Sequence, residues 1–278
     1  MTVSERFAPA KINLTLHVTG RRADGYHELD SLVVFADIGD RLHVARSDTT
    51  MLTVDGPMAA GVPADDSNLV VKAAALMGVP ADIHLEKHLP NAAGLGGGSS
   101  DAAATLNALA ELSGRAVPED VIRLGADIPV CLYGRTARMR GLGEIVEPVT
   151  DLPVLHAVLV NPKLPVMTRE VFAGLERADN PGMPEALPEF DGASALIEWL
   201  ATMRNDLEAP AIQAEPVIQQ VFDVLSVTPG CLLTRMSGSG GTCFGLYSDA
   251  ETAASAAGRL QEQQPGWWVE AVRLNAVS

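Results

Sequence analysis

The segment with the clearest chemical meaning is rich in glycine and serine and runs from Pro90 to Ser100, between a predicted strand and a predicted helix. Glycines let the backbone turn its N–H groups inward and approach a ligand closely. The following helix adds free N–H groups and the positive end of its dipole. We therefore predict a phosphate-binding loop, in which the hydroxyl groups of Ser99 and Ser100 can reach a phosphate oxygen or its Mg²⁺.

Two familiar phosphate motifs do not fit this segment. A P-loop requires Gly-Lys-Ser/Thr, but Gly98 is followed by Ser99. A dinucleotide fingerprint counted from Gly94 would need glycine or alanine at position 99, and one counted from Gly238 would need it where Cys243 stands. A tight turn between strand and helix stays open as a simpler reading of the glycines.

Two charged residues are candidates for acid–base chemistry. Lys11 is one of only four lysines and lies with Asn13 on the polar side of an alternating strand. Asp127 follows a short helix that Pro118 opens and that should end near Gly125, which puts an acid beside the negative end of a helix dipole. That unfavourable place suggests a functional reason. The sequence alone also allows an edge-strand lysine and a solvated loop aspartate.

Other residues suggest recognition of a base or a nucleotide. Tyr26 and His27 follow the turn signal Asp24-Gly25, and rings presented on a turn can stack on a flat base. Asn68 begins a predicted helix, where it could cap the helix or lie near adenine or ribose.

The amino-acid composition limits the classes of partner that this protein can bind. The 278 residues contain 20 Lys and Arg against 35 Asp and Glu, a net charge of −15. This charge argues against nucleic acid or an anionic membrane as the main partner, but a small anion could still bind in one pocket. We expect a cytoplasmic protein, because the sequence shows no signal peptide, no membrane span and no cysteine spacing suited to disulfides or zinc.

The elements that must position these residues are a mixture of strands and helices without regular alternation, which predicts an α+β fold with helices on one face of mainly antiparallel sheets. Residues 7–18 alternate, so that Lys11, Asn13, Thr15 and His17 share one face of a half-buried strand. Further predicted strands cover 30–46 (with a turn at 37–40), 51–55, 82–89, 154–160, 232–236, 242–247 and 267–274, with a hairpin at 135–149. Predicted helices cover 67–77, 99–112, 118–125, 193–203, 215–226 and 248–263, the last opened by a capping box from Ser248 to Glu251, and a loop or lid covers 178–192.

Three segments resemble the GHMP kinases, which include galactokinase, homoserine kinase and mevalonate kinase. They are Pro9-Ala-Lys-Ile-Asn13, Gly94-Leu-Gly-Gly-Gly-Ser-Ser100 and Met236-Ser-Gly-Ser-Gly240, and they span nearly the whole chain. The resemblance implies an N-terminal domain of the ribosomal protein S5 domain 2-like fold over residues 1–152. It also implies a ferredoxin-like C-terminal domain over residues 153–278, with a cleft between the two. Ala92 departs from the family, which often has glycine there.

The segments Gly20-Arg-Arg-Ala-Asp-Gly-Tyr-His27 and Leu124-Gly-Ala-Asp-Ile-Pro129 resemble one branch of the family, whose substrate carries a cytidine diphosphate group. The resemblance implies that the enzyme transfers the γ-phosphate of ATP to a hydroxyl of that small molecule, with Mg²⁺ present. A homoserine- or mevalonate-type kinase and a non-catalytic nucleotide-binding module are the alternatives, and we expect a monomer or weak homodimer.

The resemblance also implies roles for individual residues. Asp127 would act as the base and Lys11 would polarise the hydroxyl. ATP would be bound by Asn68, Pro90, Asn91, Ala92, Ala93, Gly94, Leu95, Gly96, Gly97, Gly98, Ser99 and Ser100. The substrate would be bound by Asn13, Tyr26, His27, Thr168, Phe172, Gly238, Ser239 and Gly240. Asn205-Asp-Leu-Glu208 would be structural, and Ser99, Ser100 and Asp101 are the candidate Mg²⁺ ligands.

Overall fold

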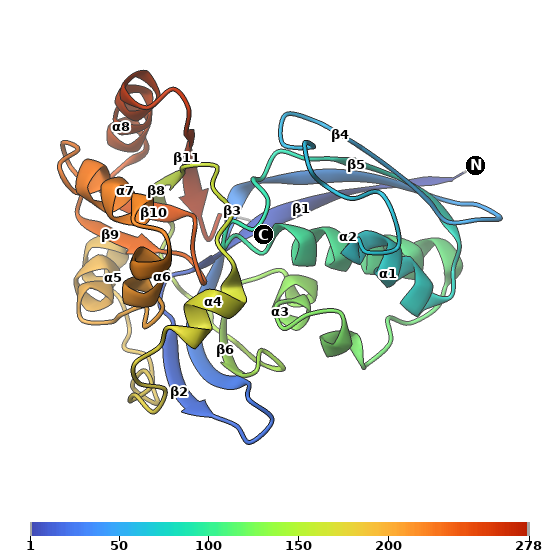
Figure 1. Cartoon of the computed structure of the whole chain (residues 1–278), viewed down its shortest axis with the longest axis horizontal. Coiled ribbons are helices and arrows are strands. Elements are labelled where there is room, and N and C mark those ends of the chain that lie inside the picture. The colour runs from blue at the N-terminus through green and yellow to red at the C-terminus, as the bar shows by residue number, and fades with distance from the viewer. Residues whose placement is uncertain (1, 277–278) are drawn as a thin grey trace.

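The longest strand, β3 (His27–Arg46), joins the two halves of the molecule into one sheet of eleven strands. This computed structural model describes residues 2–276. The strands that pair with β3 are β1 (Val3–Asn13), β2 (His17–Arg21), β5 (Ala81–Glu86), β6 (Ala137–Gly141) and β11 (Trp268–Leu274). Figure 1 shows β3 passing from the N-terminal strands to the C-terminal ones.

The remaining strands extend the sheet at both ends. In the N-terminal half, β4 (Met51–Asp55) pairs in parallel with β5, and β7 (Ile145–Pro148) forms a hairpin with β6. In the C-terminal half, the order is β11, β8 (Leu155–Asn161), β10 (Cys243–Tyr247) and β9 (Leu233–Met236). All pairs except β4–β5 are antiparallel, so the predicted α+β class is confirmed.

The helices cover the two halves differently. In the N-terminal half, the helical segments are α1 (Leu69–Met77), α2 (Gly97–Ser113), the 3₁₀ turn η1 (Val121–Arg123) and α3 (Ile128–Tyr133), and they lie on one side of the strands. In the C-terminal half, the helices are α4 (Thr168–Ala173), α5 (Gly192–Ala201), α6 (Glu208–Ala214), α7 (Val217–Ser226) and α8 (Ala250–Gln263).

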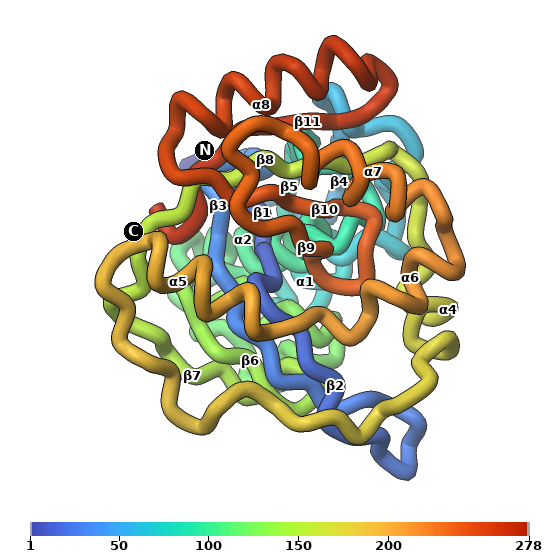
Figure 2. The backbone as a smooth tube through the Cα atoms, turned by 90° about the vertical axis from the view of Figure 1, so that its left-hand side faces the viewer, coloured from blue at the N-terminus to red at the C-terminus, as the bar shows by residue number. Residues whose placement is uncertain are grey.

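The prediction of helices on one face is wrong for the C-terminal half. Leu159 on β8 packs in one cluster with Leu196 of α5, whereas its neighbour Val158 packs in another cluster with Val221 of α7 and Leu260 of α8. Successive strand residues point to opposite faces, so this part of the sheet is covered on both sides. Figure 2 shows α5 and α8 on opposite sides of these strands.

The predicted turn at 37–40 is instead part of β3. The pairing of β1 with β3 shifts here, from Pro9 opposite Gly39 to Lys11 opposite Phe35, which marks a bulge. A Cβ atom on Gly39 would lie only 2.2 Å from the backbone oxygen of Ala8, so the two strands cross too closely for a side chain. The turn-like composition therefore reflects a bulge in a long strand.

The strand predicted over residues 7–18 is interrupted, and its alternation changes face. Lys11 and Asn13 pair opposite Phe35 and Val33, whereas His17 pairs opposite Asp30. Because residues opposite each other share a face, His17 points away from the side that holds Lys11. Residues 10–18 are all buried, so the strand is covered on both faces rather than half-buried.

Several helix boundaries also differ from the prediction. The helices α3 and α6 were not predicted, because six or seven residues are too few to show a helical period. Within the predicted helix over residues 118–125, only the short turn η1 forms. Asp249, not Ser248, caps α8, and its side chain accepts the N–H of Thr252 at 2.8 Å.

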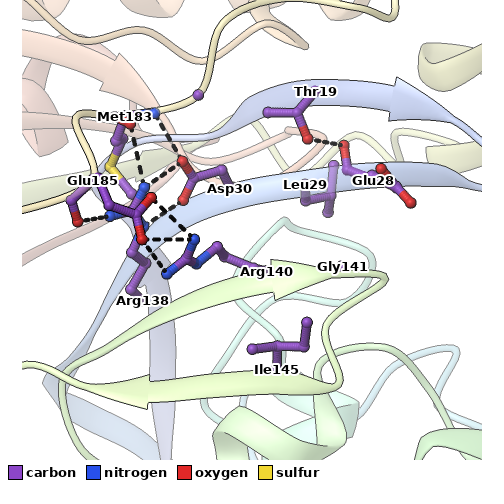
Figure 3. Close-up of a pocket in the computed structure, with 11 residues that line it drawn as sticks. Thr19, Glu28, Leu29, Asp30, Arg138, Arg140, Gly141, Ile145, Met183 and Glu185 are labelled. Atoms are coloured by element: carbon purple, nitrogen blue, oxygen red, sulfur yellow. Dashed lines mark hydrogen bonds and ion pairs between the residues drawn. The ribbon is translucent and has the colours of Figure 1, made fainter.

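The segment 178–191 has no helix or strand and packs against the face of β3 that carries Asp30. Arg138 on β6 pairs with both carboxylate oxygens of Asp30, at 2.7 and 2.8 Å. Arg138 also donates to the carbonyl of Pro184. It donates to the carbonyl of Glu185 as well, and Asp30 accepts the N–H of Met183 (Figure 3). A cavity of about 410 Å³ lies beside this clamp.

Across residues 2–276, every helix is too short or too polar to cross a bilayer. The three cysteines are free thiols, as predicted, since Cys131, Cys231 and Cys243 form no disulfide.

Candidate active site

The three segments that resemble the GHMP kinases, residues 9–13, 94–100 and 236–240, are in contact with one another in the structure. The backbone N–H of Lys11 donates to the carbonyl of Leu95 at 2.8 Å. The N–H of Asn13 donates to Oγ of Ser237 at 3.1 Å, and that hydroxyl donates to the carbonyl of Gly94 at 2.8 Å. Strand β1, the 90–100 loop and the 237–241 segment therefore form one connected structure.

Two glycines in the loop are required by this close packing. Gly94 has a φ of 72°, and a Cβ there would lie 2.2 Å from the carbonyl oxygen of Ser237. Gly96 is the N-cap of α2 with a φ of 62°, and a Cβ there would lie 3.0 Å from Cε of Lys11 and 3.7 Å from Oδ2 of Asp127. The loop thus leads directly from the N-terminus of α2 to the lysine and the aspartate.

The N-terminus of α2 has the properties of an anion site. This helix is 17 residues long and begins at Gly97, so its first N–H groups have no partner within the helix. The helix dipole adds partial positive charge at the same end.

Ala92, where the family often has glycine, takes a φ of 49°, and the left-handed region costs an alanine about 1 kcal/mol.

Lys11 and Asp127 form an ion pair beside this helix end. Nζ of Lys11 lies 2.9 Å from Oδ2 of Asp127, with side-chain exposures of 4% and 29%. Nζ also donates to Oδ1 of Asn13 at 2.8 Å, and Nδ2 of Asn13 donates to Oγ of Ser31 at 2.7 Å. Asn13 and Ser31 therefore fix the ammonium of Lys11 within the protein, while the carboxylate of Asp127 is partly exposed, so that a hydroxyl can approach it.

The predicted surroundings of Asp127 are wrong, although its side chain lies where the chemistry needs it. Asp127 is the N-cap of α3, so it is near the positive end of a helix rather than the negative end. The chain turns after η1 and starts a new helix, with Pro129 in the first turn of α3, where its fixed φ is favourable.

The predicted substrate-binding residues fall in two groups. His27 and Phe172 stack on each other, with ring centroids 5.1 Å apart and planes at 26°. These rings are in contact, so they offer one shared aromatic surface and not a slot between them. Burial, followed by the charge of Arg21, lowers the pKa of His27, which favours the neutral form of its ring. Tyr26, on the same turn, is 65% exposed.

Thr168 and the third glycine segment form the second group. Oγ1 of Thr168 lies 2.8 Å from Oγ of Ser239. Nδ2 of Asn205 donates to the carbonyls of Met236 and Gly238, each at 2.9 Å, which fixes the shape of the 237–241 turn. These bonds agree with the structural role expected for residues 205–208.

Asn68 and two of the three candidate metal ligands already have protein partners. Asn68 caps α1, since its Oδ1 accepts the N–H of Val70 at 2.9 Å. Oγ of Ser100 donates to the carbonyl of Pro9 at 2.8 Å, and Asp101 pairs with Lys87 at 2.8 Å. Within residues 2–276, no three His, Cys, Asp or Glu side chains are arranged to hold a metal ion.

The sequence interpretation missed a buried charge cluster next to the loop. Lys87 contacts Asp40 as well as Asp101, and all three side chains are at most 3% exposed. Burial raises the pKa of Asp101, and the positive charge of Lys87 opposes that shift. The available signal was the rarity of lysine, because one of only four stands directly before the glycine-rich segment.

Comparison with known proteins agrees with this geometry. The family model described as the GHMP kinases N terminal domain matches residues 68–135, and the one described as GHMP kinases C terminal matches residues 185–266. The fold and the site thus define a small-molecule kinase of a known class, and the chain belongs to the GHMP kinase family.

Two similar relatives and one solved structure carry a more specific name than the family model does. A Cereibacter sphaeroides protein is 55% identical over 98% of this chain and 99% of its own, and a Dinoroseobacter shibae protein is 58% identical over 95% and 92%. Both are named 4-diphosphocytidyl-2-C-methyl-D-erythritol kinase. The crystal structure of a 4-(cytidine 5'-diphospho)-2C-methyl-D-erythritol kinase aligns with a TM-score of 0.78 at 36% identity, over 99% of this chain and 100% of that one.

Proposed function

We propose that this protein phosphorylates the 2-hydroxyl of 4-diphosphocytidyl-2-C-methyl-D-erythritol with ATP, giving the 2-phosphate and ADP in the non-mevalonate route to isopentenyl diphosphate. The names of relatives above 50% identity over nearly the full chain support the substrate. The observation that carries the chemistry is the Lys11–Asp127 pair, 2.9 Å apart, beside the N-terminus of α2.

In this proposal, Asp127 accepts the proton of the attacking hydroxyl. The hydroxyl oxygen forms a bond to the γ-phosphorus while the bond from that phosphorus to the ADP oxygen breaks. The ammonium of Lys11 stabilises the negative charge that develops on the attacking oxygen. Asn13 keeps that ammonium in place, because its Oδ1 accepts from Nζ and its own amide is held by Ser31.

The loop from Pro90 to Ser100 binds the phosphates of ATP mainly through backbone N–H groups, which suits a chain of net charge −15. Mg²⁺ would neutralise phosphate charge during the transfer. The residues present fit a Mg²⁺ held chiefly by the nucleotide phosphates, as is usual for this ion. Of the three candidate ligands, Ser99 is the one whose side chain is not engaged in the contacts described above.

The cytidine end of the substrate lies against His27, Phe172 and Tyr26, and its neighbouring groups face Thr168, Gly238, Ser239 and Gly240. A neutral His27 can donate to and accept from the edge of a base, and the exposed ring of Tyr26 is free to turn onto it. We place the boundary between the N-terminal and C-terminal domains at residues 152 and 153, and we expect a cytoplasmic monomer or weak homodimer.

Release of ADP, measured with 4-diphosphocytidyl-2-C-methyl-D-erythritol, homoserine and mevalonate as acceptors, tests this proposal. We expect turnover with the cytidine compound and little with the other two. Turnover of mevalonate or homoserine alone would contradict the substrate assignment, and ATP binding without turnover of any acceptor would indicate a non-catalytic nucleotide-binding module.

A further inference from the structure

The buried cluster of Asp40, Lys87 and Asp101, called here the charge triad, has no part in the chemistry proposed above. Asp40 lies on β3, Lys87 directly follows β5, and Asp101 lies on α2. Buried charges require partners, and apolar residues of the same volume would stabilise a core at least as well. Stability alone therefore does not account for a cluster of three charges at this place.

The charge triad holds the entry to the phosphate-binding loop. Oδ1 of Asp40 accepts the backbone N–H of His88 at 2.6 Å and that of Leu89 at 2.9 Å. These two residues directly precede Pro90, where the loop begins. Oδ2 of the same carboxylate contacts Nζ of Lys87, so the loop entry and the lysine are fixed by one side chain.

The charge triad also holds the exit of the loop. Asp101 lies in the second turn of α2 and accepts from Nζ of Lys87 at 2.8 Å. A Cβ on Gly97, the first residue of α2, would lie 3.5 Å from Nζ of Lys87 and 3.7 Å from Oδ2 of Asp40. The three charges therefore lie directly beneath the helix end whose N–H groups face the site.

We propose that Asp40, Lys87 and Asp101 are positioning residues for the nucleotide phosphates, because they fix both ends of the 88–97 segment to one buried point. Backbone N–H groups bind an anion strongly only if they are already aimed at it, since ordering a flexible loop during binding costs affinity. The proposal rests on the proposed function in taking the ligand of this loop to be the phosphates of ATP.

The contacts give an order of importance within the charge triad. Asp40 has three partners: two loop N–H groups and Lys87. Asp101 is bound to Lys87 through Oδ2, while its buried Oδ1 has no hydrogen-bond partner. An asparagine at position 101 could turn its oxygen to Lys87 and its NH₂ to the unpartnered side. Removing the charge of Asp40 should therefore matter more.

The test compares ATP with adenosine, which lacks the phosphates, in calorimetric binding to the full-length protein. In Asp40→Asn, the amide oxygen can still accept from His88 and Leu89, but the NH₂ group meets the ammonium of Lys87. We expect the Kd for ATP to rise about tenfold or more, which is the value of a hydrogen bond to a charged group. The Kd for adenosine should stay unchanged, as should the KM for the acceptor substrate.

Asp101→Asn gives the same comparison if Asp40→Asn does not fold, with a smaller rise in the Kd for ATP. Asp37→Asn is the matched control, because it removes a carboxylate from the same strand and breaks its 2.8 Å pair with Arg273 at the surface. This control should bind ATP as the wild type does.

Equal weakening of ATP and adenosine in the variants would show a purely structural role, and unchanged ATP binding would show no role, so either result overturns the proposal. Turnover of the cytidine substrate by the wild-type protein tests the proposed function separately. If the wild-type protein binds ATP but does not turn over that substrate, the proposed function is contradicted. The comparison of ATP with adenosine still tests whether the charge triad positions the phosphate-binding loop.

Discussion

The two faces of β3 near its start use polar residues in opposite ways. On one face, Asp30 is buried and pairs with Arg138, which in turn bonds to the carbonyls of the 178–191 segment. On the other face, Ser31 leads through Asn13 to Lys11 and then to Asp127, whose carboxylate is partly open. The network of Asp30 and Arg138, whose groups are bonded within the protein, stabilises the fold. The network that ends at Asp127 has a partly exposed carboxylate, which can act on a ligand.

The cavity in Figure 3 belongs to the first of these faces and is separate from the candidate active site. It lies beside Asp30 and Arg138, away from Lys11 and Asp127. Four of its five charged side chains pair with one another, Asp30 with Arg138 and Arg140 with Glu185 at 3.4 Å. A hollow surface alone is therefore a weaker guide to function here than a polar group with free bonding capacity.

The largest expected effect is on stability, from Arg138→Met. This change leaves the carboxylate of Asp30 buried without its cation, which should lower the free energy of unfolding by about 3–5 kcal/mol. Urea denaturation measures it, with Arg140→Met as the control, because that half-exposed arginine should contribute about 1 kcal/mol or less. The turnover number of folded Arg138→Met should change little, and a loss as large as that of an active-site variant would end the distinction between the two faces.

The next effect is on catalysis, from Asp127→Asn. Removal of the base should lower kcat at least about a hundredfold, or about 2.7 kcal/mol of activation free energy, while ATP still binds. Steady-state kinetics and calorimetry measure the two quantities. Asp120→Asn is the control, since Asp120 pairs with Arg123 at the surface. Near wild-type turnover by Asp127→Asn would remove Asp127 from the mechanism.

A smaller effect concerns substrate recognition, from His27→Ala. Loss of a ring that contacts the base should raise the KM for the cytidine substrate roughly tenfold and lower kcat less. His43→Ala is the control, because His43 also stacks on a ring, that of His84 at 5.7 Å, but on the outer side of the sheet. If kcat falls more than KM rises, His27 belongs to the chemistry instead.

The smallest expected effect is a pH dependence of stability, caused by His17 on the face of β3 that carries Asp30. Burial, and then the charge of Arg204, lower the pKa of His17 below 6.5, while nearby Asp206 and Asp30 act in the opposite direction. Below pH 6.5 the unfolded chain therefore binds a proton at this residue that the folded protein does not. Stability should fall as the pH drops below about 6.5, by at most about 1.4 kcal/mol per pH unit from this group.

Urea denaturation of the wild type and of His17→Gln across this range isolates the contribution of His17. The variant should lose less stability than the wild type on acidification, and His43→Gln should behave as the wild type does. Identical pH profiles for all three proteins would show that His17 does not carry the effect.

The pattern of strands and helices predicted the fold class, and the resemblance to the GHMP kinases placed Lys11, the 90–100 loop and the 237–241 segment in one site. It failed where pairing partners are distant in sequence. The bulge at Gly39 depends on how closely β1 crosses β3, and the change of face at His17 depends on Asp30. The charge triad was missed for the same reason, since Asp40 and Lys87 are 47 residues apart.

The bonds from the 237–242 segment to the 90–100 loop also set an order of events during synthesis. The carbonyl of Ala93 is paired by the N–H of Thr242 and that of Gly94 by the hydroxyl of Ser237, a sequence separation of 143 residues for the latter pair. The loop therefore cannot reach its final shape until residues 237–242 have left the ribosome. A contact of such long range is slow to form, so the growing chain gains its nucleotide site only after that segment has been made.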